Sequence, residues 1–187
     1  ILFEPIQNDK PNNPINLLKK IAQHRKDAVL LTMFDEDKSA VQKGTCGLVN
    51  KAENIYAGDN VQTLIDKCKN VLQQKNSAVQ NNDNGSVLFQ FIPPSIQLII
   101  VGAGNDALPL VDMASLLGWN IIVVDGRPVY ATRQRFPEAN KIAMIKPAEI
   151  LSAVDIDEQT AVVLMTHNYN YDIAALEQLI NTNCKYI

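Results

Sequence analysis

The sequence predicts an α/β protein in which a Rossmann-like parallel sheet, with strand order 3-2-1-4-5 and helices on both faces, follows a smaller α/β domain. Three observations predict this class. From residue 97 onward, short apolar runs alternate with segments of helical periodicity. The runs, such as QLIIV and NIIVVD, lack the polar alternation of a half-exposed strand, as expected where helices cover both faces of a sheet. A glycine turn, VGAGNDA, joins the first run to a helix.

The first domain is expected to span residues 1–85. Its helices are expected to begin at Asn13-Pro14, where a capping side chain precedes a proline at the first helical position, and near Asp59. The run AVLLTMF, residues 28–34, predicts a strand between them. The dipeptide Asn84-Gly85 predicts a two-residue hairpin turn at the end of the domain.

The second domain is expected to span residues 86–187, because Pro93-Pro94 favours an extended connection in this region. The chain starts without methionine and ends at the strand-like CKYI, so both domains are expected to be incomplete at their outer ends. Strands are expected at 97–101, 120–125, 141–145, 161–165 and 184–187, with helices that end before Gly118 and that begin at Pro147 and at Asp172.

The glycine turn has the pattern of a dinucleotide fingerprint, with alanine in the third small position. The first glycine makes the tight turn, the second lets the backbone approach a phosphate, and the helix N-terminus offers free N–H groups to an anion. Asp125 ends the next strand about 20 residues later, where a carboxylate can accept hydrogen bonds from ribose hydroxyls. The alternative is that the glycines serve packing alone. The candidate ligand-binding residues of the turn are Gly102, Ala103, Gly104, Asn105, Asp106 and Ala107.

The other candidate residues follow two further strands. Arg127 lies close to Asp125 in the sequence, and its guanidinium could bind a phosphate or carboxylate in a bidentate way. Thr166, His167 and Asn168 follow the fourth strand, which neighbours the first in the expected order, so they are expected to face the glycine turn.

Three nearby residues are expected to have no part in ligand binding. Arg133 and Arg135 are expected in a solvated loop, and Asp172 is the expected cap of the last helix. His167 lacks an identifiable partner for acid–base chemistry, so no catalytic residue is assigned.

Composition and charge limit the classes of partner that the sequence predicts. The net charge is −3 and the basic residues are scattered, so the sequence has no basic patch of the kind that binds nucleic acid. No apolar run approaches the roughly 18 residues of a membrane span. The three cysteines are far apart, which fits neither a disulfide framework nor a metal site and favours a cytoplasmic location. Exposed edges of parallel sheets often pair, which allows a homodimer.

Several segments together resemble the xanthine dehydrogenase accessory factors of the XdhC/CoxI type. They are FEPI at the start, FIPPSIQLIIVGAGNDA, LGWNIIVVDGRPVYA, RFPEA and MTHNYNYD. The resemblance covers most of residues 89–187 and only part of the N-terminal domain.

The resemblance implies a helper in the maturation of molybdenum hydroxylases such as xanthine dehydrogenase. Such a protein would bind molybdopterin cofactor, protect it while a sulfido ligand is installed, and deliver it to the apo-enzyme. It would be a carrier or chaperone more than a catalyst, with the apo-enzyme and a cysteine desulfurase as partners. Two alternatives stay open: an NAD-dependent oxidoreductase, in which Asp125 would select NAD, and a regulatory module that senses NAD without catalysis.

Overall fold

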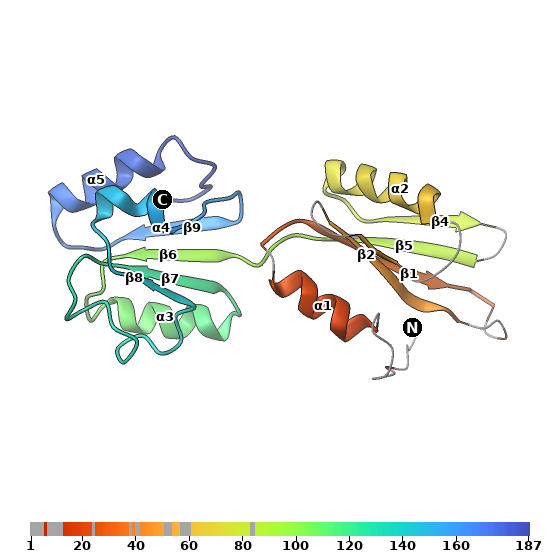
Figure 1. The fold of residues 1–187 in the computed structure, drawn as a ribbon, viewed down its shortest axis with the longest axis horizontal. Helices are drawn as coiled ribbons and strands as arrows, with labels where there is room; N and C mark the ends of the chain where they lie inside the picture. Colours follow the sequence, from red (N-terminus) through yellow and green to blue (C-terminus); the bar gives the residue numbers. More distant parts are fainter. Residues whose placement is uncertain are drawn as a thin grey trace. The chain divides into compact units, whose positions relative to one another are not determined.

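The fold of the chain divides into two compact units, residues 1–94 and 95–187, in a computed structural model (Figure 1). The structure describes residues 6, 13–23, 25–37, 39, 42–50, 54–56, 61–82 and 85–187. Within this part of the chain, every helix is too short or too polar to cross a bilayer.

The first unit is built on an antiparallel sheet. Five strands lie in the order β3-β2-β1-β5-β4, and two helices accompany them. The elements are α1 (Pro14–Gln23), β1 (Ala28–Phe34), β2 (Gly44–Asn50), β3 (Asn54–Tyr56), α2 (Val61–Gln74), β4 (Ala78–Asn82) and β5 (Gly85–Ile92).

Side-chain alternation along β1 gives this sheet two apolar faces. Val29 and Leu31 pack in one cluster with Cys68 of α2, whereas Ala28 and Leu30 pack on the opposite face with α1. Successive side chains of a strand point to opposite faces, so one apolar strand supports both helices. The first helix starts as expected: the Asn13 side chain accepts a hydrogen bond from the Asn16 N–H at 3.0 Å.

The predicted boundary between residues 85 and 86 needs correction, because the units divide after Pro94. Strand β5 pairs with the whole length of β1, from Ala28 opposite Ile92 to Phe34 opposite Ser86. It also forms a hairpin with β4, in which Asn82 pairs with Gly85. Asn84 of the predicted turn and Asp59 at the predicted helix start lie outside the described residues.

The second unit has the predicted parallel sheet with helices on both faces. Its strands lie in the order β8-β7-β6-β9, all in parallel pairs. The elements are β6 (Gln97–Val101), α3 (Ala107–Leu116), β7 (Asn120–Val124), β8 (Lys141–Ala143), the 3₁₀ helix η1 (Pro147–Glu149), α4 (Ile150–Ala153), β9 (Thr160–Leu164) and α5 (Tyr169–Leu179).

Two apolar clusters sandwich this sheet. Leu98 and Ile100 face α3, whereas Ile99 and Val101 face the side of α4 and α5 (Figure 1). The strands are buried on both sides, which explains why their sequences are continuous apolar runs.

The expected fifth strand, at 184–187, does not form a full strand. It makes a single parallel bridge between Ala161 and Tyr186, supported by a hydrogen bond of 2.8 Å from the Val162 N–H to the Tyr186 carbonyl. The observed sheet therefore has four strands, with this segment beginning an extension beside β9.

Candidate functional site

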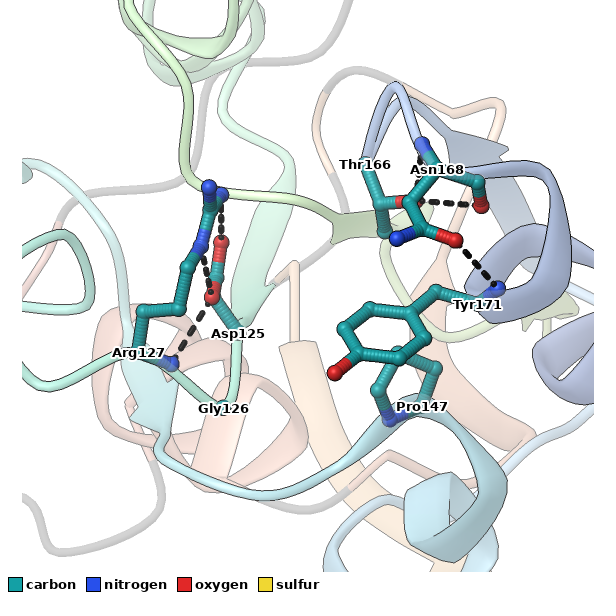
Figure 2. A pocket seen from close by; sticks show the side chains of 7 residues that line it. All are labelled: Asp125, Gly126, Arg127, Pro147, Thr166, Asn168 and Tyr171. Carbon is teal, nitrogen blue, oxygen red and sulfur yellow. Dashed lines mark hydrogen bonds and ion pairs between the residues drawn. The ribbon is translucent and has the colours of Figure 1, made fainter.

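A pocket of about 250 Å³ opens at the carboxyl edge of the parallel sheet (Figure 2). Such edges are where open α/β sheets bind ligands, since the loops that follow the strands converge there. One wall follows β7, a second follows β9, and Pro147 of η1 closes a third side. The lining residues are Asp125, Gly126, Arg127, Pro147, Thr166, Asn168 and Tyr171.

The pocket unites some of the predicted residues and leaves out others. Asp125 and Arg127, which follow β7, line it together with Thr166 and Asn168, which follow β9. The residues of the glycine turn and His167 do not belong to its lining.

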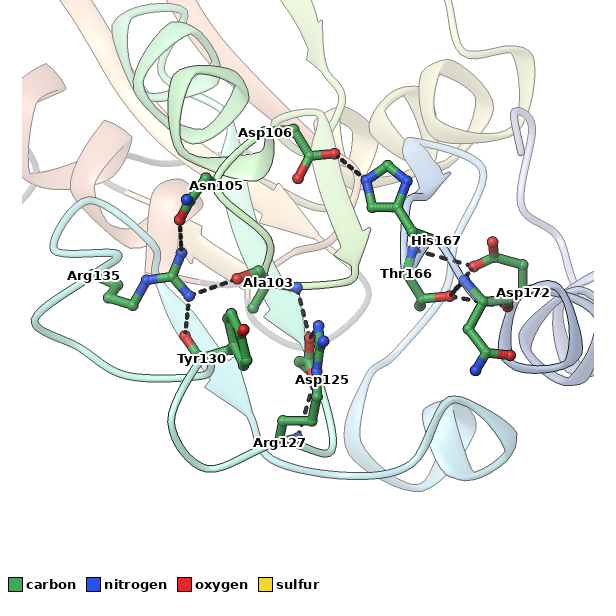
Figure 3. Close-up of polar contacts among 11 residues, drawn as sticks. Ala103, Asn105, Asp106, Asp125, Arg127, Tyr130, Arg135, Thr166, His167 and Asp172 are labelled. Carbon is green, nitrogen blue, oxygen red and sulfur yellow. Dashed lines mark hydrogen bonds and ion pairs between the residues drawn. The ribbon is translucent and has the colours of Figure 1, made fainter.

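The Asp125 carboxylate is saturated by the protein itself (Figure 3). It accepts four hydrogen bonds: from the Ala103 N–H at 2.8 Å, and from the N–H, Nε and Nη2 of Arg127 at 2.9, 3.0 and 2.7 Å. An ionised carboxylate has about four acceptor positions, so all of them are in use. A ribose hydroxyl, the partner expected from the sequence, would have to displace one of these donors.

The pKa of the Asp125 carboxyl reflects this environment. Burial favours the neutral acid and so raises the pKa, but the hydrogen bonds from Arg127 and the Ala103 amide outweigh it, and the net pKa is lowered. Asp125 therefore remains charged and links the glycine turn to the end of β7.

The Arg127 guanidinium is held from two sides. Asp125 binds it in a bidentate pair, and its Cζ lies 4.2 Å from the centroid of the Tyr130 ring. The hydrogen bond to Asp125 is the main cause that raises the pKa of Arg127. Because 48% of the side chain is still exposed, part of this fixed cation faces the pocket.

The glycine turn has the predicted tight conformation. Gly102 has a φ of +117°, and a Cβ there would collide with the backbone carbonyl of Met165. Only glycine allows both this backbone conformation and this close approach of two loops. Ala107 is fully buried in the cluster beneath α3, in agreement with the packing role of the third small residue.

The amide groups of this turn differ in their partners. The Ala103 N–H is already bound to Asp125, and the Asp106 carboxylate stands where a Cβ of Gly104 would lie. The Ala103 amide is therefore occupied within the protein, and the Asp106 carboxylate lies beside Gly104. Within the described residues, the N–H groups of Gly104 and Asn105 make no hydrogen bond.

His167 is paired with Asp106 across the two loops. Its Nε2 lies 2.6 Å from Oδ2 of Asp106, and this hydrogen bond is the main cause that lowers the pKa of the Asp106 carboxyl. His167 has a φ of +56°, a left-handed conformation that is uncommon for residues other than glycine. The ring lies outside the pocket lining, and its contact with Asp106 joins the loop after β9 to the turn before α3.

The expected cap of α5 was assigned to the wrong residue. The Asn168 side chain caps this helix, because its Oδ1 accepts hydrogen bonds from the N–H groups of Asn170 at 3.1 Å and Tyr171 at 3.3 Å. Asp172 lies in the first turn and instead accepts a hydrogen bond from Thr166 Oγ1 at 2.6 Å. The helix begins early enough to bring Tyr171 into the pocket.

Arg135 is not the solvated loop residue that the sequence suggests. Its Nη1 donates to the Ala103 carbonyl at 2.7 Å, and its Nη2 donates to Asn105 Oδ1 at 2.8 Å (Figure 3). Its guanidinium also lies 5.1 Å from the Tyr130 ring centroid. Arg133 likewise donates to the carbonyls of Pro137 and Ala139.

Sequence reasoning missed five residues around the site: Arg135, Tyr130, Tyr171, Pro147 and Gly126. No spacing rule marks the first two, because the 126–140 loop folds back on the turn through tertiary contacts. Asn168 followed by aromatic residues could have indicated Tyr171, had the cap been assigned correctly.

The comparisons with known proteins concern mainly the second unit. Residues 98–187 match the family model described as the XdhC Rossmann domain. A protein of Bacillus subtilis (strain 168), described as a probable subunit of xanthine dehydrogenase, is 35% identical over 102 residues, which are 54% of this chain and 31% of that protein. The chain therefore matches about a third of the length of this relative.

A solved structure shares the fold over nearly the whole chain. It is described as a xanthine dehydrogenase from Bacillus halodurans, and it is similar over 99% of this chain and 80% of that one, with a TM-score of 0.55 and 19% identity. Residues 98–187, which match the XdhC Rossmann-domain model, include both the glycine turn and the pocket.

Proposed function

We propose that the protein is an accessory factor for a molybdenum hydroxylase such as xanthine dehydrogenase, and that it binds molybdopterin cofactor and delivers it to the apo-enzyme. The observation that carries the proposal is the pocket at the carboxyl edge of an XdhC Rossmann domain, with Arg127 in its wall. The descriptions of the two relatives support the link to xanthine dehydrogenase. A cytoplasmic location and a cysteine desulfurase as second partner belong to the same proposal.

The residues of the pocket fit part of this cofactor. At about 250 Å³, the pocket is slightly smaller than the roughly 300–1,000 Å³ typical of ligand sites, so it would hold one end of a larger molecule. Arg127 supplies a fixed positive charge for a phosphate. Tyr171, which is 51% exposed, supplies an aromatic ring against which a flat heterocycle could pack.

The same residues favour carriage over catalysis. The pocket lining contains one carboxylate, and Asp125 is committed to four internal hydrogen bonds. His167 is committed to Asp106 outside the lining. A general acid or base must reach the proton that it transfers, so neither group is placed for that role. In the proposal, the protein binds the cofactor and shields it from solvent, and the molybdenum centre reacts only in the partner enzyme.

The test is cofactor retention by the full-length protein. After expression in cells that make molybdopterin, the protein is ultrafiltered and its pterin is measured by fluorescence. We expect pterin in the wild type, a marked loss in Tyr171→Ala, and no loss in the exposed-surface control Lys185→Gln. The loaded protein should then activate an apo-xanthine dehydrogenase. Absence of pterin from the wild type and from its mixture with added cofactor would reject the proposal.

Rossmann sheets commonly bind dinucleotides, so NAD is the competing candidate ligand, either for an oxidoreductase or for a sensing module. The saturated Asp125 weighs against it, since recognition of the ribose would break a bidentate ion pair. Calorimetric titration with NAD separates the two ideas. Tight NAD binding by protein that is free of pterin would favour the NAD module, and turnover with NADH would favour the oxidoreductase.

A further inference from the structure

The polar groups of the pocket are divided unequally between acceptors and donors. The side-chain oxygens of Asp125, Asn168 and Thr166 all accept hydrogen bonds from the protein itself. Asp125 accepts four hydrogen bonds, Asn168 Oδ1 accepts two from the backbone of α5, and Thr166 Oγ1 accepts one from the Asn168 N–H at 3.2 Å.

The donors are not satisfied in the same way. Within the described residues, Arg127 Nη1, Asn168 Nδ2 and the Tyr171 hydroxyl have no hydrogen-bond partner. The orientation of the Asn168 amide is fixed, because its oxygen must face the two N–H groups that it caps. The nitrogen is therefore the atom left for a ligand.

These donors come from opposite sides of the pocket. Arg127 follows β7, whereas Asn168 and Tyr171 belong to the start of α5, and Figure 2 shows the two groups on facing walls. The Tyr171 phenol also contributes to the raised pKa of Arg127, so the two side chains are within electrostatic reach.

We propose that this pocket binds a phosphate group of its ligand through Arg127, Asn168 and Tyr171, and that Asp125 is a positioning residue that does not touch the ligand. A site with free donors and occupied acceptors complements a group that has only acceptors, and a phosphate offers several acceptor oxygens. A ribose diol is bound best by a carboxylate, and the one carboxylate of the lining, Asp125, already accepts four hydrogen bonds from the protein. This proposal rests on the proposed function, since it names the part of the carried molecule that the pocket holds.

The role of Asp125 follows from its two connections. It binds Arg127 Nε and Nη2, which leaves Nη1 as the guanidinium edge that is free for the ligand. It also binds the Ala103 amide, so the same carboxylate fixes the arginine relative to the glycine turn. Pre-organised donors lose less conformational freedom on binding, which increases affinity without a direct contact.

The experiment compares two probes that differ only in the phosphate. Guanosine monophosphate and guanosine are titrated into the full-length protein by calorimetry, with inorganic phosphate as competitor. We expect the monophosphate to bind at least about tenfold more tightly, because a hydrogen bond to a charged group contributes about 1.5–3 kcal/mol. Phosphate should compete with the monophosphate.

Variants assign the roles. Arg127→Gln and Tyr171→Phe should each reduce the preference for the monophosphate, and Tyr171→Phe removes only the hydroxyl, so it tests the idea even if Arg127→Gln folds poorly. Lys185→Gln matches the charge lost in Arg127→Gln and should leave the preference unchanged. Asp125→Asn should weaken binding of the monophosphate but not of guanosine. If Asp125 bound the ribose instead, the same substitution would weaken binding of both probes equally.

The outcomes separate this inference from the proposed function. If the monophosphate binds no better than guanosine, or if neither Arg127→Gln nor Tyr171→Phe alters the preference, the phosphate site is rejected, even when the protein retains pterin. If the preference and its loss in the variants are observed in a protein that never retains pterin, the phosphate site stands and the cofactor assignment is rejected.

Discussion

Nε2 of His167 lies 2.6 Å from Oδ2 of Asp106, so the loop that follows β9 is joined to the turn that begins α3 (Figure 3). The same two loops meet a second time where Gly102 packs against the backbone of Met165. These two contacts add to the hydrogen bond of 2.8 Å from the Met165 N–H to the Val101 carbonyl, and both depend on unusual backbone conformations.

The first contact predicts a difference between two substitutions of His167. Both His167→Val and His167→Gly remove the hydrogen bond to Asp106, but only glycine adopts a φ of +56° without strain. We expect the valine variant to be less stable than the glycine variant by about 1–2 kcal/mol. Thermal unfolding followed by circular dichroism measures this, and equal stabilities would show that the left-handed conformation is not maintained in solution.

The second contact predicts that two glycines with positive φ respond differently to alanine. Gly102→Ala combines an unfavourable φ with a collision against Met165 and should cost at least about 3 kcal/mol. Gly118→Ala has the unfavourable φ but open space around the new methyl group, and should cost about 1 kcal/mol. Urea unfolding of both variants provides the comparison. Similar losses would mean that the approach of the two loops does not constrain residue 102.

The lowered pKa of Asp125 predicts a pH-dependent contribution to stability. A carboxyl whose pKa is lower in the folded state stabilises the protein above the unfolded value of about 3.9, and this contribution is lost as the pH falls through the lowered pKa. Asp125→Asn should therefore cost about 1.5–3 kcal/mol near neutral pH, because hydrogen bonds to a charged group are lost.

The measurement is the difference in melting temperature between the wild type and Asp125→Asn across a pH series. The difference should be constant above about pH 5 and should shrink in acid. A difference that grows as the pH falls would have the wrong sign for a stabilised carboxylate.

Burial of the thiols predicts the order in which they react. Burial is the main cause that raises the pKa of Cys68 to about 12, and the neighbouring Cys46 raises it further. Only the thiolate reacts rapidly, and Cys46 is also buried, whereas Cys184 is partly exposed. A thiol reagent at about pH 8 should label Cys184 first and the other two only on unfolding. A Cys184→Ser variant should lack the early phase, and persistence of that phase would contradict the assignment.

The sequence alone determined the class of the second unit and the edge of the sheet at which the pocket lies. Continuous apolar strands indicate burial on both faces, and the first glycine of the fingerprint indicates a tight turn, which is observed at Gly102 with a φ of +117°. Both signals are local, because periodicity and glycine conformation depend on neighbours along the chain. Four of the pocket residues could be predicted because each follows a strand, and the ends of parallel strands lie at one edge of the sheet. They are Asp125, Arg127, Thr166 and Asn168.

Only the tertiary structure decided how these residues use their hydrogen bonds. Nothing in the sequence states that the acceptors of Asp125 are filled by Arg127 and Ala103, or that Arg135 reaches back to the turn. The limits of the first unit were decided in the same way, because β5 pairs with β1 across more than fifty residues of chain. Such pairings depend on which groups the folded backbone brings within about 3 Å, and a distance of that kind is not encoded by spacing along the chain.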